Sequence, residues 1–259
     1  MKKKVIKNKK ENHNRIIFIF LVILVVLSCL VIYVLNNNGK NSLNQKDDLI
    51  KELKPFTENS AVMMYLPAVD SNNTGYMTTL KVEAKPGTGR TLVDIDGLLF
   101  WEDTQQSIRK SKAVAEIISG INTSTVDLIY TIHANASLVG GESAGAALTI
   151  ATIAALENKK IHEGIIITGS INHDGSIGPV QAILPKAQAA KESGATLFLV
   201  PLLQSRDVAY ETNKHCEPIG TSEICTNEQI PKKVNISEEA GIDVIEVGTI
   251  QEALPYFLG

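Results

Sequence analysis

Apolar and polar positions alternate along the first part of the folded region in the manner of half-buried strands. The segments AVMMYLPAV, GYMTTLKVEA and RTLVDIDG lie between residues 61 and 97, and the turn sequences DSNNTG and KPGTG separate them. Apolar residues then follow a helical spacing over residues 101–120, which end in Gly120. The pattern predicts an antiparallel, strand-rich beginning and then an amphipathic helix.

The remainder of the chain mixes strands with helices. Apolar runs predict strands at 127–136, 163–171, 195–201 and 242–248, and helices at 143–156, 185–194 and 249–258. Asp174-Gly175 predicts a hairpin turn. The segment that carries Cys216 and Cys225 is expected to be a loop. Together these elements predict an α+β (mixed α/β) fold with a mixed sheet and flanking helices.

One apolar run differs from all the others. Residues 16–35 contain no charged side chain, and at about 1.5 Å per residue a helix of this length spans roughly 30 Å, the thickness of a bilayer core. Residues 1–15 are strongly basic, whereas residues 36–59 are nearly neutral. Basic flanks stay in the cytoplasm, so we expect a cytoplasmic tail, a transmembrane helix, a linker and an external domain over residues 60–259.

Charge and cysteine content fit an external domain. Residues 41–259 carry 17 Lys and Arg against 27 Asp and Glu, a net charge of −10, which gives no electrostatic footprint for nucleic acid. Cys216 and Cys225 flank a short segment on the side expected to be oxidising, which favours a disulfide over two free thiols. No cofactor or metal site is expected.

The sequence AKPGTGRT at residues 84–91 resembles a nucleotide-binding loop but departs from it. Ala84 and Arg90 stand where that motif needs glycine and lysine, and a strand rather than a helix is predicted to follow. We therefore expect a hairpin turn here and no ATP binding.

Candidate chemistry centres on Ser143 in VGGESAGAAL. A serine at the start of an Ala-rich helix is typically an N-cap, yet the free N–H groups of a helix start can also stabilise an oxyanion beside a nucleophile. A nucleophilic serine needs a base. His133 is one candidate. Lys186 is the other, because it directly follows Pro185, is predicted to open a helix and has apolar neighbours that lower a lysine pKa.

With both residues identified, the stretches GGESAGAA, IIITGSINHDGSIGPV and ILPKAQAAKESGATLFLVP resemble the proteolytic domain of the Lon protease family. The separation of 43 residues between Ser143 and Lys186 matches that family. Weaker similarity extends over residues 60–256. The chain most resembles the membrane-anchored archaeal Lon-like proteases that lack the ATPase module.

The resemblance implies a Ser-Lys dyad peptidase in which Ser143 attacks the peptide carbonyl and Lys186 is general base and then acid. Thr168 matches the threonine that holds the lysine ammonium, and the Ser143 amide is implied in the oxyanion hole. Two departures stand out. Glu142 replaces a proline common in bacterial members, and VQAIL at 180–184 replaces a frequent Gly-Gly pair.

The expected function is ATP-independent cleavage of unfolded or flexible polypeptides at the outer membrane face, by a homo-oligomer as in the family. The alternative is an inactive, membrane-anchored binding module with the same fold.

Overall fold

The structure is a computed structural model, and it describes residues 24, 26–31, 33, 53–95, 99–134, 138–139, 141–219 and 222–258. The chain divides into two compact units, Met1–Leu53 and Lys54–Gly259. The predicted tail 1–15 lies outside the described residues, as do most of the predicted membrane segment 16–35 and most of the predicted linker 36–59.

Within residues 16–35, the described positions are helical and exposed. Among the residues that the structure describes, no helix combines the length and the apolar character needed to cross a bilayer. The membrane helix therefore stays a prediction from the sequence.

The second unit contains a four-stranded mixed sheet in the order β1-β2-β5-β3. Its strands are β1 (Ser60–Val69), β2 (Gly75–Pro86), β3 (Thr91–Val93) and β5 (Val126–His133). Strand β2 pairs antiparallel with both β1 and β5, whereas β3 runs parallel to β5. Alternate side chains of β1 and β2 are buried, as the sequence pattern predicted. The antiparallel beginning is therefore confirmed.

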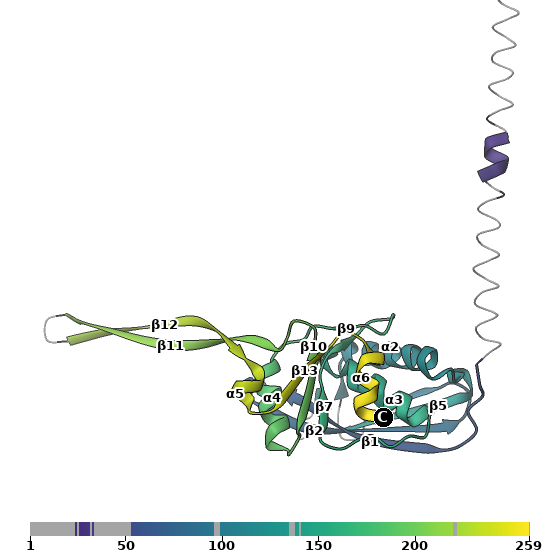
Figure 1. Cartoon of the computed structure of the whole chain (residues 1–259), viewed down its shortest axis with the longest axis horizontal. Helices are drawn as coiled ribbons and strands as arrows, with labels where there is room; N and C mark the ends of the chain where they lie inside the picture. Colours follow the sequence, from purple (N-terminus) through teal and green to yellow (C-terminus); the bar gives the residue numbers. More distant parts are fainter. Residues whose placement is uncertain are drawn as a thin grey trace, which may run out of the picture. The chain divides into compact units, whose positions relative to one another are not determined.

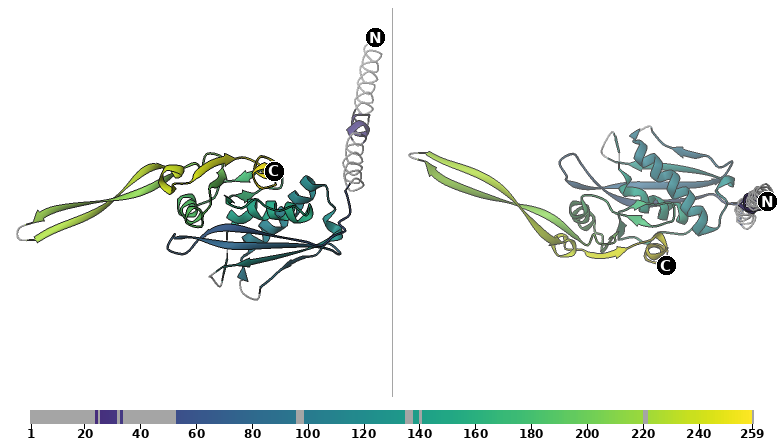
Figure 2. Two further views of the ribbon diagram at one scale, coloured as in Figure 1. Left: turned by 60° about the horizontal axis from the view of Figure 1, so that its bottom comes forward. Right: turned by 90° about the horizontal axis from the view of Figure 1, so that it is seen from above.

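Helix α3 forms the centre of the core. The helices on this side are α2 (Glu102–Ser119), α3 (Gly145–Leu156) and α6 (Ile250–Leu258). Every residue of α3 is buried, because it packs between strands β1 and β2 on one side and helices α2 and α6 on the other. Its many alanines allow this close approach, and Figures 1 and 2 show the helical layer lying over the sheet. The predicted buried helix is confirmed.

A second, parallel sheet has the order β13-β10-β7. Its strands are β7 (Ile165–Ile167), β10 (Leu197–Pro201) and β13 (Asp243–Val247), and helix α4 (Ile183–Glu192) packs between this region and strands β1 and β2. The shorter elements are β4 (Leu99–Phe100) paired with β6 (Leu138–Val139), β8 (Ser170–Ile171) paired with β9 (Ile177–Gly178), η1 (Thr123–Thr125), η2 (Glu142–Ala144) and α5 (Ile236–Ala240). The β8–β9 pair confirms the predicted Asp174-Gly175 hairpin.

The prediction of a loop around the cysteines is wrong. Strands β11 (Arg206–Ile219) and β12 (Ser222–Asn235) form a two-stranded antiparallel hairpin, called the arm below, which extends away from the rest of the second unit (Figures 1 and 2). Each strand has 14 residues and therefore measures roughly 45 Å. Cys216 and Cys225 face each other across the arm and are joined by a disulfide. The predicted bridge is thus present.

The loop that resembles a nucleotide-binding motif encloses a side chain of its own chain. The Asp127 carboxylate accepts hydrogen bonds from the backbone N–H groups of Thr88 and Arg90 at 2.9 Å each, and from the Arg90 Nε at 2.8 Å. A Cβ at Gly87 would lie 2.3 Å from the Asp127 Cγ, so the backbone closes tightly around this carboxylate. Strand β3 follows, as predicted, and no helix start is available for phosphate.

These bonds hold the pKa of Asp127 well below its ordinary range, first through the Arg90 side chain and then through the two backbone groups. A carboxylate whose pKa is lower in the folded state stabilises the fold at every pH above its pKa in the unfolded state. This stabilisation is lost as the pH falls towards and through the pKa of the folded state. We predict that Asp127→Asn lowers the free energy of unfolding at pH 7, and that its difference from the wild type shrinks only below about pH 4. Urea titrations between pH 3 and pH 7 measure this difference.

Asp243→Asn is the matched control for this change, because Asp243 is an exposed aspartate at the start of β13. It is expected to leave the free energy of unfolding unchanged. Equal stability of Asp127→Asn and the wild type at pH 7 would contradict the role given to Asp127.

Candidate functional site

The turn that carries Ser143 is fixed to helix α2. The N–H of Gly141 donates to the Asp103 Oδ2 at 2.8 Å, and Gly141 has a φ of 107°, a conformation that favours glycine. The η2 turn then runs directly into α3, whose N-cap residue is Ala144. No side-chain capping bond is made at the start of η2 or of α3, so the half-buried Ser143 is not an N-cap and its hydroxyl is not used for capping.

Two backbone hydrogen bonds join the serine turn to the end of β7. The Gly169 N–H donates to the Ser143 carbonyl at 3.0 Å, and the Ala146 N–H donates to the Gly169 carbonyl at 2.9 Å. A Cβ at Gly169 would lie 2.4 Å from the Ile177 Cγ2, and its φ of 155° is a second reason why glycine suits this position. The position of Ser143 therefore depends on β7 as well as on its own helix.

Thr168 belongs to the same junction. Its side chain is fully buried, and its Oγ1 donates to the Ser143 carbonyl at 3.3 Å. The structure thus shows Thr168 holding the backbone of the serine turn. The contact between Thr168 and the lysine ammonium, which the family resemblance implied, stays a prediction.

Lys186 lies in the first turn of α4 but does not open it. The helix begins at Ile183, so Pro185 is the third helical residue, and the expected start at residue 185 is wrong by two residues. Proline is accepted there because the first four N–H groups of a helix have no intrahelical partner. The Lys186 side chain nevertheless remains next to the helix N-terminus.

Burial sets the charge state of Lys186. Its exposed fraction is 3%, and its Nζ donates to the Gln181 carbonyl at 3.1 Å. Loss of hydration disfavours the ammonium and lowers the pKa of Lys186 to about 8. By contrast, Lys159, Lys160 and Lys191 are exposed, as the sequence predicted. A substantial neutral fraction near physiological pH is what a lysine base requires.

Ser143 and Lys186 line one cleft of about 850 Å³. Its walls come from the β1–β2 turn, the serine turn, the loop before α4 together with the first turn of α4, and the base of the arm. The lining residues are Val69, Asn73, Gly141, Glu142, Ser143, Pro179, Val180, Gln181, Ala182, Leu184, Pro185, Lys186, Asp207 and Val208. The two residues that the sequence selected are therefore brought to a common cavity, and it is large enough for several side chains of a peptide.

The other candidates lie elsewhere or have simpler roles. His133 is exposed at the end of β5 and is not among the residues that line the cleft. Glu142 is exposed at the cleft edge, and its carboxylate lies 3.6 Å from the Lys110 Nζ of α2. Lys110 is half-buried and Glu142 is exposed, and such a long-distance surface pair contributes little to stability. The structure gives Glu142 no contact with Lys186.

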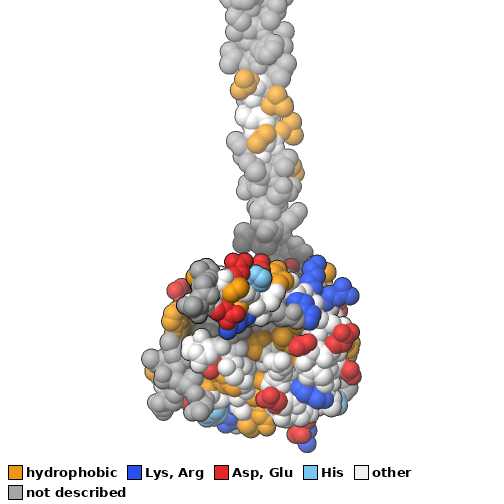
Figure 3. Space-filling model, turned by 90° about the vertical axis from the view of Figure 1, so that its left-hand side faces the viewer, with side chains coloured by type: hydrophobic (Ala, Val, Ile, Leu, Met, Phe, Trp, Pro, Cys, Tyr) orange, Lys and Arg blue, Asp and Glu red, His pale blue; other side chains and the backbone are white. Residues whose placement is uncertain are grey.

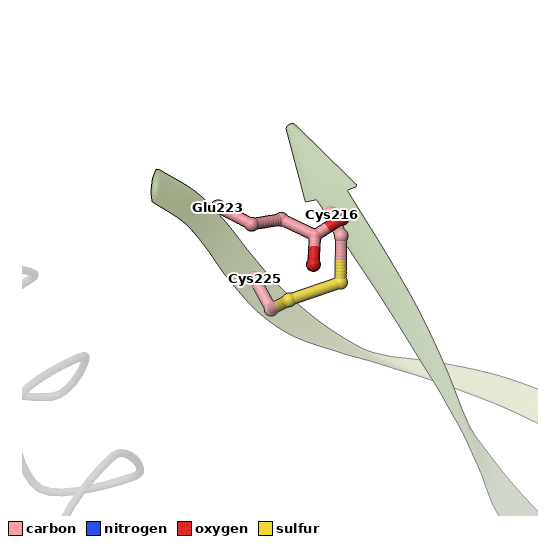
Figure 4. A group of neighbouring side chains, drawn as sticks. All are labelled: Cys216, Glu223 and Cys225. Carbon is pink, nitrogen blue, oxygen red and sulfur yellow. A yellow bond between two sulfur atoms is a disulfide. The ribbon is translucent and has the colours of Figure 1, made fainter. Parts of the chain in front are cut away.

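Cys216, Glu223 and Cys225 are close enough together to suggest a metal site, as Figure 4 shows. Both sulfur atoms belong to the disulfide, however, and a metal ligand must be a free thiolate. Figure 3 views the second unit from the side on which the arm projects, where acidic and basic side chains are interspersed. This face lacks, among its described residues, the continuous basic surface that binds a nucleic-acid backbone.

Sequence reasoning missed the cleft residues that come from outside the motifs. Asp207 and Val208 at the base of the arm could not be placed while that segment was taken for a loop. Gln181 meets Lys186 through its main-chain carbonyl, and a main-chain contact leaves no mark on residue type.

Comparison with known proteins assigns the family. The model of the Lon protease (S16) C-terminal proteolytic domain matches residues 78–234, which is more than half of the chain. The archaeal Lon protease of Thermococcus kodakarensis is 29% identical over 157 residues, covering 60% of this chain and 24% of that protein. Lon protease 2 of Bacillus subtilis is 25% identical over 202 residues, covering 74% of this chain and 32% of that protein.

The chain thus spans between about a quarter and a third of the length of these two relatives. The matched region contains β5, the serine turn, α3, α4 and most of the arm. On this match, the chain belongs to the family of the Lon protease (S16) C-terminal proteolytic domain.

Proposed function

We propose that the protein is a serine endopeptidase in which Ser143 is the nucleophile and Lys186 is the general base and acid. The observation that carries the proposal is that a half-buried serine without a capping role and a buried, desolvated lysine line the same cleft. The family assignment supports the same chemistry.

In the proposed reaction, neutral Lys186 takes the proton of the Ser143 hydroxyl while Oγ attacks the peptide carbonyl carbon. The N–H of Ser143, in the first turn of a helix, stabilises the oxyanion of the tetrahedral intermediate. Protonated Lys186 then gives its proton to the leaving amine, and an acyl-enzyme forms. Water, deprotonated by Lys186, attacks this ester, and Lys186 then gives that proton to the Ser143 Oγ as the acid product leaves.

The proposed substrates are unfolded or flexible polypeptides, because the cleft of about 850 Å³ is large enough for several peptide side chains and the proposed chemistry uses no nucleotide. Asp127 already occupies the loop that resembles a phosphate-binding motif, which supports cleavage without ATP in this unit. We further propose that residues 16–35 anchor the protein in the cell membrane with the peptidase domain outside, and that it assembles as a homo-oligomer. The Cys216–Cys225 disulfide supports an oxidising location.

Removing either member of the dyad is expected to abolish cleavage. Ser143→Ala and Lys186→Ala should each lower kcat/KM for casein or a flexible peptide by at least about a thousandfold, as knockouts of interdependent catalytic groups do. Circular dichroism should show an intact fold. His133→Ala is the control and should keep wild-type activity, and loss of activity in His133→Ala with full activity in Lys186→Ala would refute the dyad. An inactive wild type would instead favour the binding module.

The rate should depend on pH through Lys186. Because only the neutral amine accepts the serine proton, kcat/KM should rise with pH, by about tenfold per pH unit well below the pKa, and level off above about 8. A pH–rate profile between pH 6 and pH 10 measures this. A profile that is already flat at pH 6 and 7 would mean that another group is the base.

The proposed orientation predicts which lysines an impermeant reagent reaches. In intact cells, a membrane-impermeant amine reagent should modify the exposed Lys159 and Lys160, whereas the lysines of residues 1–15 should react only after permeabilisation. Peptide mapping by mass spectrometry distinguishes these sites. The opposite labelling pattern would reverse the topology.

A further inference from the structure

The side-chain amide of Gln204 hydrogen-bonds both main-chain groups of Val180, a residue of the cleft wall. Its Oε1 accepts from the Val180 N–H at 2.9 Å, and its Nε2 donates to the Val180 carbonyl at 2.7 Å. Both main-chain groups of Val180 are therefore satisfied by a single amide. Gln204 itself is not among the residues that line the cleft.

Two hydrogen bonds hold the turn that carries Gln204. The Gln204 N–H donates to the Pro201 carbonyl at 3.2 Å, which closes a β-turn with Leu203 at a φ of 65°. Leucine rarely adopts this left-handed conformation, and such strain persists only where the surroundings enforce it. The Glu246 carboxylate of β13 accepts from the Ser205 N–H at 2.8 Å and holds the turn from the other side. The turn from which the Gln204 side chain extends is therefore itself held in place by hydrogen bonds.

The segment that Gln204 holds leads directly to the lysine. Val180 precedes Gln181, whose carbonyl accepts from the Lys186 Nζ at 3.1 Å. Ala182 follows in the left-handed conformation, with a φ of 59°, and is the N-cap of α4. A non-glycine residue in this conformation also needs external support. The stretch VQAIL at 180–184 stands where many family members have a Gly-Gly pair, and the two hydrogen bonds from Gln204 to Val180 supply support directly beside it.

We propose that Gln204 is a positioning residue for the catalytic base: by fixing Val180, it holds the Gln181 carbonyl against the Lys186 Nζ and keeps the loop closed over the lysine. The catalytic meaning of this contact rests on the proposed function. The titratable groups that share the cleft with Lys186 are Glu142 on the serine turn and Asp207 at the base of the arm. Substitution of Gln204 changes neither of them.

Two variants of Gln204 separate positioning from packing. Gln204→Leu removes both hydrogen bonds at similar volume. Gln204→Met also removes both hydrogen bonds, but it keeps an unbranched side chain of similar length and adds no charge near Lys186. The matched control is Gln229→Leu, because Gln229 on the exposed arm also donates from its side chain, to the Thr212 Oγ1 at 3.1 Å.

The first readout is the titration of Lys186 in the full chain with ¹⁵N-labelled lysines, followed by NMR and assigned with Lys186→Arg. Loss of the two hydrogen bonds between Gln204 and Val180 should admit water to the Lys186 amine. Its pKa should then rise by roughly half a pH unit or more, towards that of a free lysine. Gln204→Met should show a shift of similar size in the same direction, and Gln229→Leu none. The second readout is kcat/KM for a flexible peptide, which should fall at least about threefold at pH 7 in Gln204→Leu.

An unchanged titration of Lys186 in both Gln204 variants would overturn the inference, even if activity or thermal stability fell, because packing alone would explain such losses. If Gln204→Leu does not fold, Gln204→Met decides in the same way. If the wild type cleaves no peptide, the proposed function is refuted. If the titration of Lys186 is nevertheless shifted in the Gln204 variants, Gln204 still positions the lysine.

Discussion

The burial of helix α3 on all sides is the constraint on which the rest of the structure depends. Its small side chains let the four-stranded sheet, α2 and α6 approach it together, and this fixes the helix along its whole length. The Tyr130 hydroxyl, fully buried in β5, meets the Thr152 Oγ1 of α3 at 2.9 Å and so satisfies two polar groups within the core. Because α3 is packed on all sides, the η2 turn directly before it holds Ser143 at a defined place in the cleft wall.

Lys186 reaches the same cleft from a separate part of the fold. Its helix packs against strands β1 and β2 and against α5, and a Cβ at Gly75 would lie only 1.9 Å from the Pro185 carbonyl. This close approach of β2 to the first turn of α4 requires a residue without a side chain. The packing buries the lysine among apolar groups and backbone, and burial lowers its pKa without any neighbouring cation. The same packing that stabilises α4 therefore lowers the pKa of the lysine that we propose as the base.

Much of this arrangement was predictable from the sequence because its signals are local. Alternation along β1 and β2 identified the strands, the Ala-rich run identified α3, and the spaced motifs selected Ser143 and Lys186, which line one cleft. The arm was missed because nearly every described side chain of β12 is exposed, so no apolar alternation marks a strand. The start of α4 was misplaced because proline strongly favours a first helical position. Gln204 was not foreseeable, since its partner is the main chain of a residue far away in the sequence.

The central claim is that Lys186 activates Ser143. The most direct measurement is the reaction of the full chain with a fluorophosphonate reagent at pH 8, with the modified residue located by mass spectrometry. The wild type should be modified at Ser143, and Lys186→Met, which fills the buried space without a base, should remain unmodified while folded. Equal modification of Ser143 in both proteins, or none in the wild type, would contradict this account.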